Sequence, residues 1–236
     1  MKAMIFAAGL GTRLFPITQD KPKALAPFKG TTLLEYNLRF LASQGVTEFV
    51  INTHHFANKI EEYLIENNNF GLKIQLSFEP ILLDTAGGLA QTASFFDENE
   101  DLLLYNVDVI SNIDIQAMYQ KHQSSNAAAT LAIRNRKTSR YLLFNKENTL
   151  CGWRNKITNM EIWSRSKKGI ISEFAFSGIH FINMSLIKSL EIKNLSIVPF
   201  YLTEAKKQRI MGYQHDSDYW FDCGKIESLK EAEKFI

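Results

Sequence analysis

The sequence predicts an α/β fold in which helices cover both faces of a mixed, mainly parallel central sheet. The main evidence is the alternation, through the first half of the chain, of short apolar runs with segments of helical periodicity. A second observation is that polar residues or a glycine follow the apolar runs, namely Gly9, Asn52, Glu79 and Asp108. Because the carboxyl ends of parallel strands meet at one edge of a sheet, we expect these four residues to line that edge. Beyond about residue 126, strand-like segments follow one another directly, so we expect the sheet to become mixed there.

The first half of the chain contains four predicted strands separated by helices. The first predicted helix shows the pattern most clearly, because Leu34, Leu38 and Leu41 fall on one face. Thr32 and Glu35 have the spacing of a capping box at its start. The predicted strands are residues 4–8, 49–52, 74–78 and 102–105, and the predicted helices are residues 32–44, 56–65 and 87–96.

The second half is richer in strand signals. Its predicted strands are residues 127–133, 140–144, 149–153, 161–163 and 174–182, and its predicted helices are residues 195–209 and a last one from near Ile226. The second and third of these strands flank an Asn-containing turn and predict a hairpin. Because there is no linker, repeat or low-complexity tract, we expect one domain over residues 1–236, made of two halves at about 1–125 and 126–236.

Composition excludes several classes of protein. The 236 residues carry a net charge of +2, with 45% hydrophobic and 22% charged residues, which is ordinary for a globular domain and gives no case for nucleic-acid binding. The two cysteines show no zinc or disulfide spacing. No apolar run approaches the roughly 18 residues of a membrane span, and the N-terminus lacks the features of a signal peptide. We therefore expect a cytoplasmic enzyme with no membrane partner.

The glycine loop after the first strand is the most informative stretch. Gly9 and Gly11 allow a sharp turn and a close approach of ligand to backbone, and successive N–H groups in such a turn suit anions. Arg13 and Lys23 add two cations for phosphate oxygens. The dinucleotide fingerprint fails because Leu14 stands where it needs a glycine, and the P-loop ending is also absent.

The ordered string Ala-Ala-Gly-x-Gly-Thr-Arg-x-x-Pro-x-Thr, followed by Lys-Pro-Lys-Ala-Leu, occupies residues 7–25. It resembles the signature of the sugar-1-phosphate nucleotidylyltransferases, and the resemblance extends from Lys2 to the last helix. It implies a Rossmann-like fold of the nucleotide-diphospho-sugar transferase type, with a nucleotide-binding first half and a sugar-binding second half. In that family the loop covers the triphosphate, which implies nucleotide contacts from Ala8, Gly9, Gly11, Thr12, Arg13 and Lys23.

The same resemblance implies the reaction. The family joins a nucleoside triphosphate and a sugar 1-phosphate into a nucleotide sugar and pyrophosphate, with Mg²⁺ as the cofactor. Because no hexapeptide-repeat domain follows the last helix, the chain looks like the short members, such as N-acetylmuramate 1-phosphate uridylyltransferases and mannose- or heptose-1-phosphate guanylyltransferases. UTP or GTP is the expected nucleotide, in nucleotide-sugar synthesis for cell-envelope polysaccharide. An added stretch at about 134–171, where the sugar should sit, leaves the sugar undecided.

Two aspartates follow strand-like runs far apart in the sequence. Asp108 ends Asn-Val-Asp and Asp222 lies in Trp-Phe-Asp-Cys-Gly, which look like the family's two metal motifs. Such residues could also be helix caps or solvated loop residues, but Mg²⁺ prefers carboxylate oxygens together with water and phosphate. The resemblance implies that Asp108 and Asp222 hold the metal, and that Arg13, Lys23 and Asp108 are the catalytic residues.

Two further segments resemble ligand-contacting parts of the family. Leu-Asp-Thr-Ala-Gly-Gly implies nucleobase contacts from Thr85, Gly87 and Gly88, against the alternative of a plain helix start capped by Thr85. Phe-Ser-Gly-Ile implies sugar contacts from Ser177 and Gly178, together with Asn106, although a glycine inside a strand can equally mark a bulge.

Several side chains are left without an assigned role. Of the adjacent His54 and His55, we expect one to face the cleft and the other to be structural, since successive side chains of a strand point to opposite faces. Arg140 is suited either to a sugar phosphate or to solvent. Trp153, Trp163 and Phe174 fit either the core or a surface on which a sugar stacks.

Two other classes of function stay open. A non-catalytic sugar-nucleotide-binding regulator would be favoured by the loss of a metal carboxylate or of Arg13, and neither is missing. A glycosyltransferase using a nucleotide sugar prefers Asp-x-Asp, whereas the sequence at 106–108 is Asn-Val-Asp. The sequence does not reveal whether the chain is a monomer or a small homo-oligomer.

Overall fold

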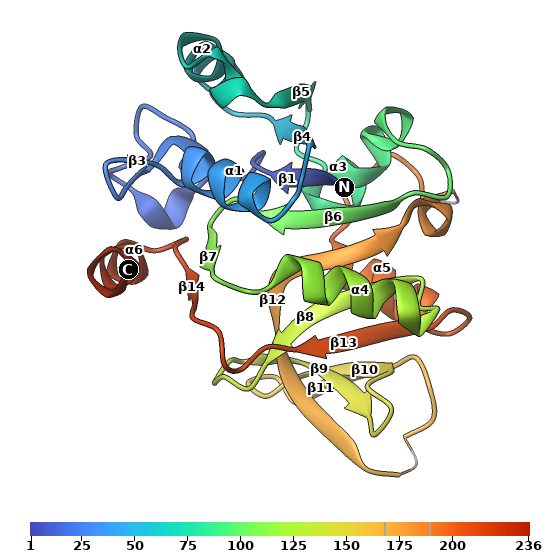
Figure 1. Ribbon diagram of the computed structural model, residues 1–236. Coiled ribbons are helices and arrows are strands. Elements are labelled where there is room, and N and C mark those ends of the chain that lie inside the picture. The colour runs from blue at the N-terminus through green and yellow to red at the C-terminus, as the bar shows by residue number, and fades with distance from the viewer. Residues whose placement is uncertain (168, 189) are drawn as a thin grey trace.

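The computed structural model describes residues 1–167, 169–188 and 190–236 (Figure 1). Its centre is a run of four parallel strands in the order β5-β4-β1-β6. Their bounds are β1 Lys2–Phe6, β4 Glu48–Thr53, β5 Lys73–Phe78 and β6 Asp101–Asn106. From β1 the chain adds β4 and then β5 on one side of β1, and β6 then pairs with the other side of β1. The strand order therefore reverses between β1 and β6, and in open α/β sheets ligands bind at such a point.

The second half extends this sheet with mainly antiparallel strands, as expected. The long strand β12 pairs with β6 and β8 along one part of its length and with β9 along another. Beyond β9 the order continues through β10 to β11, while β13 pairs in parallel with β8. Figure 1 shows β9–β11 at the end of the molecule opposite β5. These strands are β8 Ala129–Arg134, β9 Arg140–Asn145, β10 Leu150–Asn155, β11 Met160–Trp163, β12 Ile171–Asn183 and β13 Ile210–Gln214.

Helices cover both faces of the sheet, which confirms the predicted fold class. Helices α1 Leu33–Ser43, α2 Ala57–Glu66 and α4 Ile115–Ser125 pack apolar side chains into one core cluster. Helices α3 Asp84–Gln91 and α5 Ile197–Glu204 pack into a second cluster on the opposite face. Each cluster takes alternate side chains of the same central strands, such as Ile5 for the first and Met4 for the second.

A third, smaller cluster joins the glycine loop to the end of the chain. It contains Leu14, Phe28, Ile110 and Leu229. Its elements are α6 Ile226–Phe235, the antiparallel pair β7 Val109–Ser111 and β14 Trp220–Asp222, and the pair β2 Pro27–Phe28 and β3 Thr31–Thr32. Short 3-10 turns lie at Thr12–Leu14, Lys23–Leu25, Asn68–Gly71, Ala93–Phe95 and Met184–Ile187. The C-terminal helix thus packs beside the loop that follows β1.

The start of α1 shows how far the local pattern determines the structure. The Thr32 hydroxyl accepts a hydrogen bond from the Glu35 backbone N–H at 3.1 Å, as the capping box predicts. The Glu35 carboxylate does not return to the Thr32 backbone. It accepts hydrogen bonds from Arg39 and from the Tyr63 hydroxyl, so it ties α1 to α2 instead.

Some predicted elements have wrong bounds and others were missed. The first strand, predicted at 4–8, runs over Lys2–Phe6. The helix predicted at 87–96 begins earlier and ends earlier, at Asp84–Gln91, and the helix predicted at 195–209 ends at Glu204. Strand β13 follows that helix and was not predicted, because Gly212 within it interrupts the strand pattern. Helix α4 was also not predicted, because Ile115, Met118 and His122 are the only side chains it buries.

No helix among the described residues is both long enough and apolar enough to span a lipid bilayer.

The buried His180 makes a prediction for the pH dependence of stability. Its Nδ1 lies 2.6 Å from the Tyr201 hydroxyl, and burial lowers its pKa from 6.5 to about 3. The unfolded chain therefore takes up this proton first as the pH falls. The resulting stabilisation is complete above pH 6.5 and is lost as the pH falls towards 3, with a slope of up to about 1.4 kcal/mol per pH unit.

We expect His180→Gln to flatten the fall in the free energy of unfolding between pH 6.5 and pH 4, measured by urea denaturation. The exposed His55 provides a control, since His55→Gln should leave the slope as it is in the wild type. An unchanged slope in His180→Gln would contradict this account.

Candidate functional site

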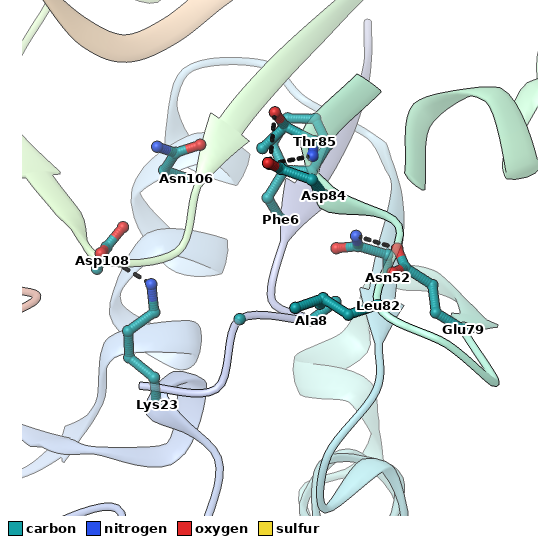
Figure 2. A pocket seen from close by; sticks show the side chains of 11 residues that line it. Phe6, Ala8, Lys23, Asn52, Glu79, Leu82, Asp84, Thr85, Asn106 and Asp108 are labelled. Atoms are coloured by element: carbon teal, nitrogen blue, oxygen red, sulfur yellow. Dashed lines mark hydrogen bonds and ion pairs between the residues drawn. The ribbon is translucent and has the colours of Figure 1, made fainter. Parts of the chain in front are cut away.

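A cavity of about 200 Å³ opens at the carboxyl ends of the parallel strands, where the strand order reverses (Figure 2). The expectation that Gly9, Asn52, Glu79 and Asp108 line one edge is confirmed, since all four line this cavity. The remaining lining residues are Phe6, Ala8, Lys23, Leu82, Asp84, Thr85 and Asn106. The cavity thus brings together residues from five segments that are distant in the sequence.

The glycine loop turns tightly over Lys23. Gly11 has φ +67°, a left-handed conformation that favours glycine, and a Cβ on it would lie 2.9 Å from Lys23 Cβ. The backbone N–H groups of the exposed Gly9 and Leu10 make no intramolecular hydrogen bond within the described part of the chain. These amides are therefore available to an anion, as a phosphate-binding loop requires.

Four charged side chains converge beside this loop. Lys23 Nζ lies 2.8 Å from Asp108 Oδ2, and both side chains are largely buried (Figure 2). A Cβ placed on Gly224 would lie 2.7 Å from Arg13 Nη2, 2.8 Å from Asp222 Oδ1 and 2.9 Å from Asp108 Oδ2. The two carboxylates and the guanidinium therefore surround a single point, and only glycine leaves that point open.

The pairing of two short strands brings the two aspartates together. In the β7–β14 pair Asp222 lies opposite Val109, and the Cys223 N–H donates to the Asp108 carbonyl at 2.8 Å. Burial, with the carboxylates of Asp108 and Asp222, raises the pKa of the Cys223 thiol to about 12, so it stays a neutral thiol at neutral pH. The acceptors presented at this point are carboxylate oxygens.

These two carboxylates suit a magnesium ion. Within residues 1–167, 169–188 and 190–236 no group of three or more His, Cys, Asp or Glu side chains is arranged to hold a metal. Mg²⁺ typically takes only one or two protein carboxylates and completes its shell with water and substrate phosphate. Asp108 and Asp222 are the residues that could hold such an ion. Asp108 lines the cavity and Asp222 does not, and glycine at position 224 leaves the space between their carboxylates open.

Asn52 and Glu79 form the wall of the cavity that lies across from Lys23 and Asp108 (Figure 2). Asn52 Oδ1 accepts from the Ala7 N–H at 2.8 Å, and its Nδ2 donates to Glu79 Oε1 at 2.7 Å. Glu79 Oε2 accepts from the Leu83 N–H at 3.0 Å, and the side chain is fully buried. The sequence placed both residues at the sheet edge but gave no sign of this chain of hydrogen bonds, because it depends on contacts across 27 and 45 positions.

Of the three residues predicted on the nucleobase side, only Thr85 lines the cavity. Its hydroxyl accepts from the Ile197 N–H at 2.8 Å, so it caps α5 rather than its own helix. A Cβ on Gly87 would overlap the Lys193 carbonyl oxygen, and one on Gly88 would lie 2.5 Å from Glu79 Oε1. Atoms of the protein itself therefore fill the space beside both glycines. Leu82 and Asp84, and not the two glycines, line the cavity together with Thr85.

Of the three predicted sugar contacts, only Asn106 lines the cavity. Gly178 packs against Asn106, since a Cβ at Gly178 would lie 2.7 Å from Asn106 Nδ2. Gly178 has φ +73° and lies where the register of β12 with β8 shifts, so it is a bulge glycine. The Ser177 hydroxyl is fully buried, 2.7 Å from His215 Nε2, and Ser177 does not line this cavity.

The side chains without an assigned role have separate locations. His54 Nδ1 contacts the Glu79 carbonyl oxygen at 2.7 Å, and the exposed His55 lies against Phe56, so the expectation that one of the pair faces the cleft is wrong for the cavity described. Arg140 and Trp153 line a second cavity. Trp163 donates to Glu161, and Phe174 packs on the second core cluster.

The sequence model of the family described as nucleotidyl transferase matches residues 2–236. The chain belongs to the nucleotidyl transferase family. This membership argues against the glycosyltransferase class, and solved structures share the fold.

Individual relatives of this nucleotidyltransferase cover its whole length. It is 29% identical over 235 residues to an N-acetylmuramate alpha-1-phosphate uridylyltransferase of Neisseria meningitidis serogroup B, covering 99% of this chain and 97% of the relative. It is 26% identical to a D-glycero-alpha-D-manno-heptose 1-phosphate guanylyltransferase of Aneurinibacillus thermoaerophilus, with coverage of 99% and 97%. HddC from Yersinia pseudotuberculosis complexed with GMP-PN has the same fold, at TM-score 0.79, 18% identity and coverage of 99% and 98%.

We expect Glu79→Gln to destabilise this nucleotidyltransferase by about 1–3 kcal/mol in urea denaturation. Asn52 and the Leu83 N–H both donate to the carboxylate, so one of the two donors would face the new amide NH₂ group. Asn52 cannot reverse its amide without losing the bond from Ala7. Glu66→Gln, at an exposed position on α2, is the control and should be neutral. Equal stability of the two variants would contradict the hydrogen bonds described for the Glu79 carboxylate.

Proposed function

We propose that this nucleotidyltransferase joins a nucleoside triphosphate and a sugar 1-phosphate into a nucleotide sugar, with release of pyrophosphate and dependence on Mg²⁺. The observation that carries the proposal is the convergence of Arg13, Lys23, Asp108 and Asp222 beside a glycine loop whose amides are free to bind phosphate. The relatives' names support it, because they describe uridylyl and guanylyl transfer to sugar 1-phosphates.

The triphosphate would bind along the glycine loop. The free amides of Gly9 and Leu10 and the exposed Thr12 suit phosphate oxygens, and Arg13 adds a permanent charge. The base and ribose would extend towards the wall formed by Leu82, Asp84 and Thr85. UTP and GTP are the expected nucleotides, as the names of the relatives suggest.

The chemistry would be a direct displacement. An oxygen of the sugar phosphate attacks the α-phosphorus and forms the new P–O bond, while the bond from that phosphorus to the bridging oxygen breaks and pyrophosphate leaves with its electron pair. The two substrates can react directly with each other, and Lys23 and Asp108 in the cavity are paired with one another, which fits a reaction without a covalent enzyme intermediate. The protein's role is then to position the substrates and to neutralise phosphate charge.

The charged groups have complementary roles in that scheme. Bound Mg²⁺ would neutralise phosphate charge and orient the reacting oxygens, and Asp108 and Asp222 would hold it. Lys23 neutralises Asp108 in the structure described. With a cation on the carboxylate, the ammonium would be available to a phosphate oxygen, and Arg13 would stabilise the departing pyrophosphate.

The test is a pyrophosphate-release screen of the four nucleoside triphosphates against a panel of sugar 1-phosphates, with Mg²⁺ and with EDTA. We expect release with at least one pair, abolished by EDTA. Asp108→Asn and Asp222→Asn should each lower the rate by about 100-fold or more while the thermal unfolding transition remains cooperative. Asp97→Asn, at an exposed position, should keep the wild-type rate.

Release from no pair would contradict the proposal and favour a binding protein without catalysis. Activity of Asp108→Asn close to that of Asp97→Asn would contradict the metal assignment.

A further inference from the structure

A second cavity of about 440 Å³ lies between the β9–β11 strands and α5. Most of its wall is apolar or aromatic, and its cationic groups are two arginines. The lining residues are Arg136, Thr138, Arg140, Leu142, Trp153, Met160, Ile162, Phe176, Ser196, Val198, Pro199 and Leu202. This combination suits a ligand that carries an anionic group on a partly apolar body.

Arg136 is a guanidinium without a counterion in this structure. Its carbon Cζ lies 4.5 Å from the centre of the Trp220 ring, and Nη2 donates to the Phe176 carbonyl at 3.3 Å. Its Nε is buried and has no hydrogen-bond partner, and none of the described carboxylates forms an ion pair with it. Burial is the main reason why the pKa of Arg136 is lowered. A half-buried charge with an unsatisfied donor is costly, so the position favours an anionic ligand.

Arg136 lies near Asp222, one of the four charged residues beside the glycine loop. Trp220 and Asp222 are two residues apart on β14, so their side chains point to the same side of that strand, about 7 Å apart along it. The Trp220 indole donates to the Ser177 carbonyl at 2.9 Å, which fixes the ring on which Arg136 stacks. Asp222 also acts electrostatically on Arg136. A phosphate held by Arg136 would therefore lie close to the proposed metal site.

The walls beyond Arg136 define the rest of the ligand. Leu142, Ile162, Val198 and Leu202 present aliphatic surface, and Trp153 presents an aromatic one. A sugar bearing only hydroxyl groups would leave those groups without hydrogen bonds against such walls. An N-acyl or deoxy substituent would instead bury apolar surface there.

We propose that Arg136 binds the phosphate of the acceptor, and that the second cavity selects sugar 1-phosphates carrying an N-acyl or deoxy substituent. The proposal rests on the proposed function and specifies its acceptor. Arg136 presents a planar fork that matches phosphate oxygens, and its stacking on Trp220 fixes the orientation of that fork.

The test is isothermal titration of the wild type and variants with N-acetylglucosamine 1-phosphate, glucose 1-phosphate and UTP or GTP. We expect N-acetylglucosamine 1-phosphate to bind the wild type more tightly than glucose 1-phosphate does. Arg136→Met should lose about tenfold or more in affinity for both sugar phosphates and none for the triphosphate. Arg136→Lys should recover part of the loss, because it restores charge but not the fork.

Lys137→Met is the matched control, since it removes one positive charge at the neighbouring, exposed position. It should bind all three ligands as the wild type does. The proposal is overturned if Arg136→Met and Lys137→Met bind sugar phosphates equally, if the triphosphate affinity falls in parallel, or if the wild type prefers glucose 1-phosphate or binds neither. If sugar phosphates bind but no pair of substrates releases pyrophosphate in the screen, the proposed function is overturned. The affinities of the Arg136 variants then still test whether Arg136 binds the sugar phosphate.

Discussion

The carboxylates of Asp108 and Asp222 lie beside Gly224 at the edge of the parallel sheet. The closeness of these two negative charges determines which groups can surround them. Like charges at such distance repel in a partly buried site, so cations must compensate them. Lys23 supplies one through its ion pair with Asp108, and Arg13 supplies another at Gly224. The short β7–β14 pair sustains the arrangement, since it fixes Asp222 opposite Val109.

This constraint explains why the end of the chain belongs to the same site as its beginning. The third core cluster packs α6 and β14 onto the segment that follows β1, so residues near 222 meet residues near 13. The glycine loop then faces the cavity with free amides, while Asn52 and Glu79 hold the opposite wall. Cations, amides and carboxylates are thereby preorganised before any substrate binds, which is the main requirement for stabilising phosphate charge in a transition state.

Local pattern predicted the parallel half of the fold, and the resemblance to the sugar-1-phosphate nucleotidylyltransferases predicted the charged centre. The apolar run at residues 4–8 overlaps the buried strand β1, and the two aspartates and the glycine loop stand in motifs that can be read in order. The missed features depend on tertiary contacts. Gly87 and Gly88 look like ligand-facing glycines, but backbone and side-chain atoms from residues 193 and 79 fill the space beside them. Arg136 carries no motif, and its importance follows from Trp220, 84 positions away along the chain.

The central claim is that Asp108 and Asp222 share one divalent cation with the triphosphate. The most direct measurement is anomalous scattering from crystals grown with Mn²⁺ and a non-hydrolysable triphosphate analogue. The account predicts a peak in contact with both carboxylates and a phosphate oxygen, at coordination distances of about 2.1 Å. A manganese ion bound to the triphosphate but to neither aspartate, or a triphosphate bound away from the Gly9–Gly11 loop, would contradict it.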